Sequence, residues 1–354
     1  MCVERWWKGP VKAEPDFDNM LKVLRRERPA RPTLFEFFMN EPLYRILAPE
    51  ALSGPNSSRI DNSLYELRGL MMHAFANAGY DYSVLYGSDF KFPAGEIQLK
   101  ATRSWNEGAV ITDRKSFEKY NWPDPDDFDY GILDALADEM PGGMKLIAYG
   151  PGGVLENILQ LVGFENLCMM LVDDPDLASE IFDAIGARLV RHYEICVQHD
   201  TVGAVIGNDD WGFKTQTMLS PADMRRYVIP WHKKIVQVAH AAGKPAILHS
   251  CGNLAAVMDD VIDIGYDAKH SYEDTIQPVE DAYEQYHDRI AILGGIDLDF
   301  VVRSEPQQVY KRAKTLLQQT ADRGGYALGT GNSVPEYAPH ENYLAMIAAA
   351  TENR

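Results

Sequence analysis

The chain repeats one local pattern, a short apolar run followed by a longer segment with helical periodicity. Each run is only a few residues long, which is typical of a parallel strand buried on both faces. Helical segments with a 3.6-residue period separate most of the runs, so the sequence predicts alternating strands and helices. The eight strand candidates are Thr33–Phe38, Tyr82–Tyr86, Lys145–Tyr149, Ala204–Gly207, Ala246–His249, Tyr266–Lys269, Ile290–Leu293 and Tyr326–Leu328.

Helix starts carry clear capping signals. In Ser220-Pro-Ala-Asp223, the serine stands at the cap, the proline at the first helical position and the aspartate at the third. The serine oxygen can accept a bond from a backbone N–H that has no helical partner, and the aspartate complements the helix dipole. A helix is therefore expected to begin directly after Ser220.

Eight alternating units predict a single (β/α)8 barrel, that is, a TIM barrel. The alternative is an open, doubly wound sheet. The barrel is favoured because Gly150-Pro-Gly-Gly153 lacks the glycine spacing of a dinucleotide-binding loop. We expect an N-terminal arm and helix over residues 1–30 and the barrel domain over residues 31–354. The segment from Ser88 to Gly143 has weak periodicity and is expected to be an excursion over the barrel mouth after the second strand.

Composition excludes several classes of protein. The 354 residues carry 34 basic and 52 acidic side chains, a formal charge of −18. A nucleic-acid binder needs clustered Lys and Arg, so none is expected here. Four scattered cysteines make no disulfide framework, the first residues do not resemble a signal peptide, and no apolar stretch is long enough to span a membrane. A cytoplasmic enzyme is the expectation.

Polar residues follow most of the predicted strands. The functional residues of a barrel lie just beyond the C-terminal ends of its strands. We therefore expect carboxylates after the second and fourth strands to act in acid or base catalysis, and polar or aromatic neighbours to bind substrate. The catalytic candidates are Asp89, Asp209 and Asp210, and the substrate-binding candidates are Tyr149, Asn208, Trp211 and Asn332.

The strongest single signal is His249-Ser-Cys251, at the end of the fifth predicted strand. In an extended chain, residues i and i+2 point to the same side, so the imidazole and the thiol can converge on one metal ion. Zinc prefers nitrogen and sulfur ligands, and a catalytic zinc site needs a third protein ligand and an open position. The alternative is that His249 is a hydrogen-bonded strand-end residue and Cys251 a small buried hydrophobe.

Asp209 and Asp210 are adjacent and face opposite ways in an extended chain. One of them can enter the barrel mouth as a base, a substrate acceptor or a metal ligand, while the other caps the following turn. The sequence leaves open which of the two does which, and a pair of loop carboxylates without catalytic function is the alternative.

These motifs occur together in an order that resembles the uroporphyrinogen decarboxylase superfamily. The resemblance runs from about Asp16 to Ala350 and is closest from Tyr149 onward. The motifs that carry it are Gly163-Phe-Glu165, Asp174-Pro175, Asn208-Asp-Asp-Trp-Gly212, Ser220-Pro221, Pro230-Trp-His-Lys233, His249-Ser-Cys-Gly252, Gly294-Gly-Ile-Asp297 and Asn342.

The resemblance implies a (β/α)8 barrel and one of two activities. One group of the superfamily comprises the decarboxylases of haem synthesis, which use no metal. The other comprises zinc-dependent methyltransferases that work with corrinoid proteins, on coenzyme M or in O-demethylation. The decarboxylases' arginine motif is replaced here by Glu36-Phe-Phe-Met-Asn-Glu41, so substrate carboxylates are expected to meet glutamates. Ser88-Asp89 does match an essential aspartate of the decarboxylases.

The methyltransferases resemble this chain more closely, because they carry the His-x-Cys pair. Their second cysteine falls near Thr330 here. The resemblance therefore implies zinc on His249 and Cys251, with an oxygen ligand from Asp210 or Glu273, or else a metal-free site. Asn208-Asp-Asp-Trp-Gly212 looks closest to the O-demethylase branch.

The first hypothesis is thus a corrinoid-linked methyltransferase acting on a small methylated compound, such as an aryl methyl ether. Zinc and a cobalamin carried by a partner protein are the implied cofactors, and a homodimer is the implied assembly. The rivals are a metal-free decarboxylase or other lyase on a small carboxylic acid, with Asp89 and Asp209 as acid and base, and a binding protein on an inactive barrel.

Overall fold

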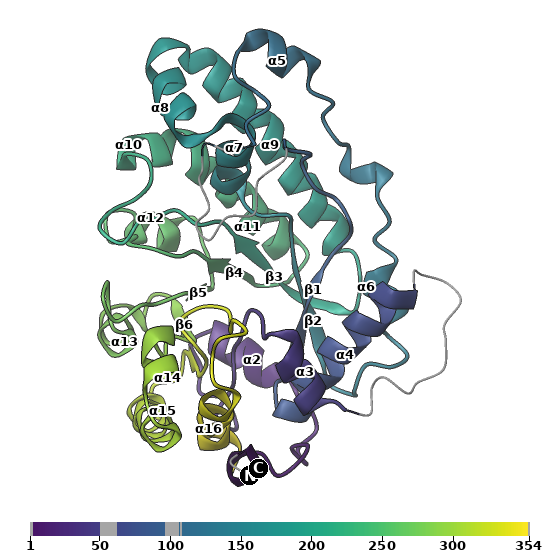
Figure 1. Ribbon diagram of the computed structural model, residues 1–354, viewed down its shortest axis with the longest axis vertical. Helices are drawn as coiled ribbons and strands as arrows, with labels where there is room; N and C mark the ends of the chain where they lie inside the picture. Colours follow the sequence, from purple (N-terminus) through teal and green to yellow (C-terminus); the bar gives the residue numbers. More distant parts are fainter. Residues whose placement is uncertain (1–2, 50–61, 96–105, 107, 353–354) are drawn as a thin grey trace.

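The computed structural model describes residues 3–49, 62–95, 106 and 108–352. Its centre is a parallel sheet of seven strands in sequential order, β1 to β7 (Figure 1). The strands are β1 (Tyr82–Tyr86), β2 (Lys145–Tyr149), β3 (Val202–Asn208), β4 (Ala246–His249), β5 (Ala268–His270), β6 (Ala291–Leu293) and β7 (Tyr326–Ala327). The predicted α/β class and parallel sheet are confirmed, and three strands have the predicted bounds.

The prediction of an eight-stranded closed barrel is wrong, because the described residues form a seven-stranded sheet in which β1 and β7 do not pair with each other. The segment Thr33–Phe38 forms no strand and joins the sheet through a single parallel bridge between Leu34 and Leu328, beside β7. On the side toward β1, the hydroxyl group of Tyr82 accepts from the Glu36 N–H and donates to the Glu36 carbonyl, both at 2.7 Å. A side chain thus occupies the place where backbone pairing would complete an eighth strand.

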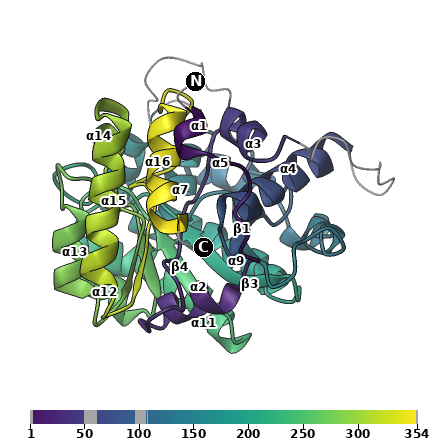
Figure 2. The same ribbon diagram turned by 90° about the horizontal axis from the view of Figure 1, so that it is seen from below.

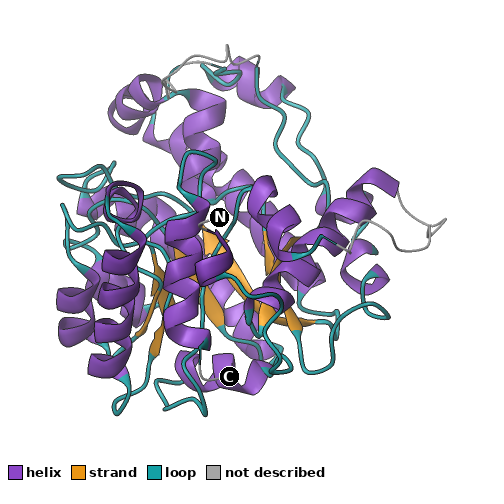
Figure 3. Cartoon of the chain, turned by 60° about the horizontal axis from the view of Figure 1, so that its bottom comes forward, coloured by secondary structure: helices purple, strands orange, loops and turns teal. Residues whose placement is uncertain are grey.

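Helices pack around the sheet, as the orange strands enclosed by purple helices in Figure 3 show. Many begin at the residues that the sequence indicates: the Ser220 side chain accepts from the Asp223 N–H, with Pro221 at the first helical position. The helices are α1 (Val3–Trp6), α2 (Phe17–Leu24), α3 (Glu41–Leu47), α4 (Asn62–Ala78), α5 (Arg114–Lys119), η2 (Pro125–Asp127), α6 (Ile132–Ala135), α7 (Val154–Val162), α8 (Phe164–Asp173), α9 (Pro175–Cys196), α10 (Pro221–Asp223), η3 (Met224–Val228), α11 (Ile229–Ala241), α12 (Met258–Asp263), α13 (Val279–Tyr286), α14 (Leu298–Arg303), α15 (Pro306–Thr320) and α16 (His340–Thr351).

The N-terminal arm lies on the C-terminal helices. α1 packs beside α16 (Figure 2), and the ring of Trp6 lies 5.3 Å from that of Tyr310 on α15. Trp6 and Trp7 are both partly buried against the core of their own chain. The arm therefore has an intramolecular packing role.

The excursion expected at residues 88–143 lies partly outside the described residues. Its described part carries α5, η2 and α6, and Val110 and Ile111 donate backbone hydrogen bonds to the Leu161 carbonyl at the end of α7. Among the described residues, no single helix is long and apolar enough to cross a membrane. α7 and α8 meet that criterion only as a pair bent by 95°.

Candidate functional site

The strand register brings a set of polar and aromatic side chains to one inner face. Tyr86 is the register partner of Tyr149, Asn208 of His249, and His249 of His270. Register partners on parallel strands point to the same face of a sheet. A Cβ at Gly207 would meet the hydroxyl of Tyr266 on the other face, so these side chains point inward. The carboxyl ends of β1 to β5 therefore present them to a common site.

Asp210, His249 and Cys251 form a cluster at the ends of β3 and β4. One carboxylate oxygen, one imidazole nitrogen and the thiol sulfur all lie within 4.8 Å of one another. The Cys251 sulfur lies 3.8 Å from Nε2 of His249, and the Asp210 Oδ1 accepts from the Cys251 N–H at 2.8 Å. Tetrahedral zinc with bonds of 2.0–2.3 Å holds its ligand atoms about 3.3–3.8 Å apart. The nitrogen and sulfur donors are types that zinc prefers, and the 3.8 Å between Nε2 and the sulfur matches this spacing, so the three residues could hold a metal ion.

Two further side chains hold the Cys251 sulfur. The Ser271 hydroxyl donates to it at 3.4 Å, and the Asn332 amide donates to it at 3.2 Å. Hydrogen bonds to a sulfur stabilise its thiolate form, which is the form that binds a metal. Asn332, predicted to bind substrate, thus contacts the cluster of Asp210, His249 and Cys251.

A buried chain of hydrogen bonds lies behind His249. Its Nδ1 lies 2.8 Å from Nδ1 of His270, and Nε2 of His270 lies 3.2 Å from the Thr330 carbonyl oxygen. The Thr330 hydroxyl contacts both carboxyl oxygens of Glu36, at 2.9 and 3.0 Å. The rings of Phe37 and Phe35 pack on the two imidazoles, with centroids 4.6 and 4.9 Å away.

Burial controls the protonation of this site. It lowers the pKa of His249 to about 3, with help from the charge of Lys269. It raises the pKa of Cys251 to about 12, with the carboxylate of Asp210 adding to the effect. Without a metal, the protein thus holds a neutral imidazole and a protonated thiol at neutral pH. A bound metal ion would favour the thiolate strongly enough to release that proton.

Close backbone contact clamps the two loops of the cluster together. A Cβ at Gly252 would lie 2.0 Å from the Gly212 carbonyl oxygen, and Gly252 has φ +85°, which favours glycine. The Asn253 N–H donates to the Phe213 carbonyl at 2.8 Å. Asp210 and Cys251 therefore keep a fixed separation.

Ser271 has a strained backbone with φ +85°, a rare value for a residue with a side chain. The amine of Lys269 donates to its carbonyl at 2.5 Å and to the Ser250 and His270 carbonyls at 3.5 Å. Burial lowers the pKa of Lys269 to about 8. Lys269 thus holds Ser271 in the conformation from which the hydroxyl reaches Cys251.

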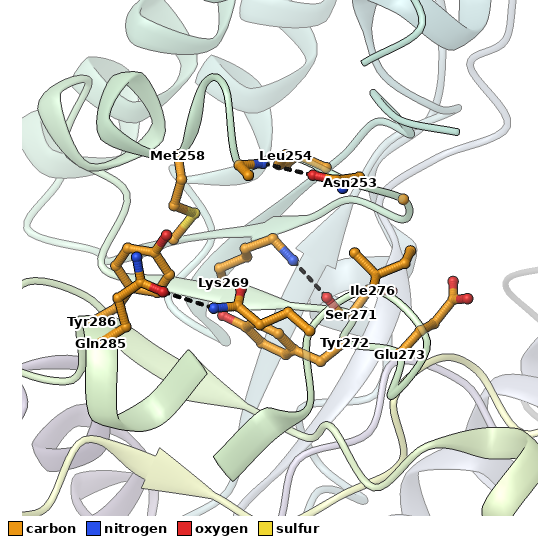
Figure 4. Close-up of a pocket in the computed structure, with 13 residues that line it drawn as sticks. Asn253, Leu254, Met258, Lys269, Ser271, Tyr272, Glu273, Ile276, Gln285 and Tyr286 are labelled. Carbon is orange, nitrogen blue, oxygen red and sulfur yellow. Dashed lines mark hydrogen bonds between the residues drawn. The ribbon is translucent and has the colours of Figure 1, made fainter. Parts of the chain in front are cut away.

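A cavity of about 240 Å³ lies beside this loop. Figure 4 shows Lys269, Ser271 and Tyr272 along it, with Asn253 on the facing loop and Met258 at the start of α12. None of the three residues Asp210, His249 and Cys251 lines this cavity, so the cavity lies beside their cluster and is not its mouth.

Glu273, a predicted metal ligand, is not part of the cluster. It lies three residues beyond β5 and lines this cavity and a second one, next to Asp297. In Figure 4 its carboxylate points away from Lys269. The structure brings Asp210 to His249 and Cys251 instead.

Asp209 and Trp211, predicted to act on substrate, are fully buried on the outer side of the sheet. The Asp209 carboxylate accepts from the Leu155 and Glu156 N–H groups at the start of α7, at 3.0 and 2.9 Å. It also accepts from Nε1 of Trp211 and Nε2 of His232, both at 2.9 Å. Four donors thus anchor Asp209 in the framework, and neither residue reaches the mouth.

The remaining candidates lie around the mouth. Tyr149 is half-buried, and its ring lies 5.3 Å from those of Phe37 and Tyr86 and 5.1 Å from that of Phe38. Asn208 points inward beside His249, and its buried Oδ1 has no hydrogen-bond partner among the residues that the structure describes. Asp89 is exposed beyond β1, outside the cluster.

Of the two glutamates expected to meet substrate carboxylates, Glu36 does not do so. It is fully buried against Thr330, where burial raises its pKa to about 8. Glu41 is exposed on α3 and pairs with Arg45. Conversely, sequence reasoning assigned no role to Ser271 and Lys269, because no motif marks a strained residue or the amine that holds it.

Comparison with known proteins identifies the family of this chain. The sequence profile described as uroporphyrinogen decarboxylase (URO-D) matches residues 78–353. The chain belongs to the uroporphyrinogen decarboxylase family. This confirms the resemblance drawn from the motifs.

Relatives in the family carry both activities. The chain is 25% identical over 225 residues to the methylated-thiol–coenzyme M methyltransferase of Methanosarcina mazei, a match that covers 63% of this chain but only 57% of that protein. It is 25% identical over 295 residues to the uroporphyrinogen decarboxylase of Anaeromyxobacter dehalogenans, covering 77% of this chain and 80% of that one. A solved methyltransferase from Methanosarcina mazei shares the fold, with a TM-score of 0.65 at 16% identity over 95% of this chain and 98% of that one.

Proposed function

We propose that this protein is a zinc-dependent methyltransferase that moves a methyl group from a small methylated substrate to a corrinoid protein. The observation that carries the proposal is the convergence of Asp210, His249 and Cys251 at the ends of adjacent strands. A nitrogen, a sulfur and an oxygen ligand with one open position is the donor set of a catalytic zinc site. Relatives named as coenzyme M methyltransferases support methyl transfer as the type of reaction.

The metal-binding residues have defined tasks. His249 and Cys251 would supply the nitrogen and sulfur ligands of a bound zinc ion, and Asp210 would supply the oxygen ligand. Ser271 and Asn332 hold the sulfur with their hydrogen bonds. Zinc bound there would polarise the substrate heteroatom that carries the methyl group. A corrinoid carried by a partner protein would supply the nucleophile that takes the methyl group, and the heteroatom would leave with the electron pair of the broken bond. The task of this chain is therefore to bind and orient the substrate.

The aromatic wall beside the cluster supports a methoxylated aromatic substrate. Phe38, Tyr86 and Tyr149 are half-buried and lie with ring centroids 5.1–5.3 Å apart around Tyr149. Offset and edge-on packing against such rings favours a planar aromatic ligand. The Asn208 side chain, which is partly exposed and points inward beside His249, offers this ligand an amide group for hydrogen bonding.

The experiment measures metal content in protein purified without an affinity tag or chelator. We expect about one zinc ion per chain in the wild type, and its loss in Cys251→Ala. Cys168→Ala is the matched control, because Cys168 is an exposed thiol outside the cluster, and it should keep its zinc. Methylation of cob(I)alamin by methoxylated benzenes, followed by its visible spectrum, then tests the activity.

A wild type that stays metal-free after incubation with zinc would refute the zinc mechanism. A metal-free decarboxylase would then be the favoured hypothesis, since a relative named uroporphyrinogen decarboxylase has the same 25% identity to this chain as the methyltransferase. Release of carbon dioxide from small carboxylic acids, by wild type and by Asp89→Asn, would test that reading.

A further inference from the structure

We propose that His270 is a positioning residue that holds His249 in the tautomer whose Nε2 can bind a metal. The inference rests on the proposed zinc site, and it names the group that prepares that site. It is built on hydrogen-bond roles, because an imidazole presents a lone pair on one nitrogen only when its proton sits on the other.

The carbonyl group of Thr330, at the far end of the chain of hydrogen bonds, fixes the proton of His270. The carbonyl oxygen of Thr330 can only accept, so Nε2 of His270, 3.2 Å away, carries a proton and donates. The Gly295 N–H donates to the same carbonyl at 2.9 Å, which fixes its direction. The proton of His270 therefore has one defined position.

His270 is fully buried, and its ring contacts the apolar ring of Phe35. Its two nitrogens face the Thr330 carbonyl and Nδ1 of His249, with no carboxylate among their partners in the described structure. A second proton would place an uncompensated charge in this apolar setting, at high cost. His270 is therefore neutral, and its Nδ1 is an acceptor.

His249 must then donate from its own Nδ1, which lies 2.8 Å from that acceptor. A neutral His249 with a proton on Nδ1 has a bare Nε2. That nitrogen is the atom 3.8 Å from the Cys251 sulfur, on the side of the metal cluster. The buried pair thus aims a lone pair at the metal position, as outer partners of metal-bound histidines do.

Thr330 gives this arrangement its rigidity. Its N–H and hydroxyl both contact Glu36, at 3.2 and 2.9 Å, and its hydroxyl also donates to the Asn332 carbonyl. Asn332 in turn donates to the Cys251 sulfur. Thr330 therefore supports His249 through His270, and it supports Cys251 through Asn332.

The first test reads the tautomer directly, in metal-free wild-type protein labelled with ¹⁵N-histidine. Long-range proton–nitrogen spectra distinguish a protonated from a bare imidazole nitrogen, and His249→Gln identifies the signals among the nine histidines. We expect His249 to be protonated on Nδ1 and bare on Nε2. A proton on Nε2 would overturn the inference.

The second test compares variants of His270. In His270→Gln, the amide oxygen can accept from His249 and the amide N–H can donate to Thr330, so both roles are kept. His270→Leu fills similar space but offers no acceptor. We expect zinc affinity to fall about 10- to 100-fold in His270→Leu relative to His270→Gln, with His249 shifting toward mixed tautomers.

His192→Gln is the matched control, since His192 is equally buried but bonds to Tyr130 and the Tyr149 carbonyl, outside the cluster. It should bind zinc as the wild type does. Equal zinc affinity in His270→Leu and His270→Gln would refute the positioning role. A His249 protonated on Nδ1 in a wild type that binds no zinc would support the inference while refuting the proposed function.

Discussion

Asp209 and Asp210 are neighbours in the sequence, and the structure gives them separate tasks that mutation can divide. Asp209→Ala removes the acceptor of four buried donors, two of them backbone N–H groups of α7. Each buried donor left without a partner costs about 1–3 kcal/mol, less where the surroundings relax. We expect the free energy of unfolding to fall by about 4 kcal/mol or more.

Asp209→Asn grades the same effect. The Oδ2 atom of Asp209 accepts three of the four bonds, and an amide oxygen in its place can keep them. The Glu156 N–H then faces an amide nitrogen, and the remaining bonds lose their charge assistance. A loss of about 1–3 kcal/mol is expected, clearly less than for alanine.

Asp210→Asn is the matched comparison on the same loop. Its Oδ1 has one backbone partner, the Cys251 N–H, which an amide oxygen can keep. The free energy of unfolding should change by less than about 1 kcal/mol, while zinc affinity falls by more than about tenfold because the charged oxygen ligand is gone. Urea unfolding and zinc titration of the three variants separate the two effects. If Asp209→Ala unfolds like the wild type, keeps its zinc and loses turnover, Asp209 is catalytic and its framework role is wrong.

Three further predictions concern the supports of the site. Gly252 has φ +85°, and Gly252→Ala places a Cβ 2.0 Å from the Gly212 carbonyl oxygen. The substitution should lower both the stability measured by thermal unfolding and the affinity measured by zinc titration. Gly142→Ala should change neither, because a Cβ there meets no atom of the described residues within 4 Å. Glu36 keeps its proton up to about pH 8 in the folded protein but releases it near pH 4.5 in the unfolded chain. As the pH rises from 4.5 to 8, the free energy of unfolding of the wild type relative to that of Glu36→Gln should therefore fall by up to about 5 kcal/mol, and it should stay level outside this range. A difference that does not vary with pH would contradict the protonated Glu36. Tyr149→Leu should raise KM for an aromatic substrate about 2- to 10-fold without loss of zinc, because aromatic contacts are worth about 0.5–1.5 kcal/mol. Tyr310→Leu should leave KM unchanged, because Tyr310 lies on α15, away from the mouth.

Most of the architecture could be predicted from the sequence because local signals agree with the global fold. Apolar runs of strand length gave β1, β2 and β4 with their observed bounds, and Ser220-Pro221 marked the start of α10. The family followed from motifs at strand ends, where function concentrates in this class of fold.

The site was predicted only where its residues are close in sequence. The spacing of His249 and Cys251 is a local property, and a strand end fixes it. Whether Asp209 or Asp210 joins them depends on the direction in which β3 ends, which the register with β4 decides. The sequence therefore cannot choose between Asp210 and Glu273 as the third ligand. Among the described residues, the cluster contains Asp210 and not Glu273.

The residues that sequence reasoning missed act through tertiary contacts. His270 is distinguished from any buried histidine only by its bonds to His249 and Thr330, which come from different strands and loops. Likewise, nothing in the local sequence indicates that Lys269 holds a strained Ser271. Such supports follow from the assembled fold and from no spacing along the chain.

The place where the strand prediction failed is also the place that supports the site. Thr33–Phe38 has the apolar pattern of a strand, yet its fourth residue is Glu36, whose neutral carboxyl group is buried against Thr330. The Tyr82 hydroxyl takes both backbone groups of Glu36 and so prevents pairing with β1. A regular eighth strand would satisfy those groups by backbone pairing alone. The irregular segment instead fixes Glu36, and through it Thr330, His270 and His249, so a local departure from the barrel pattern supports the proposed metal ligand His249.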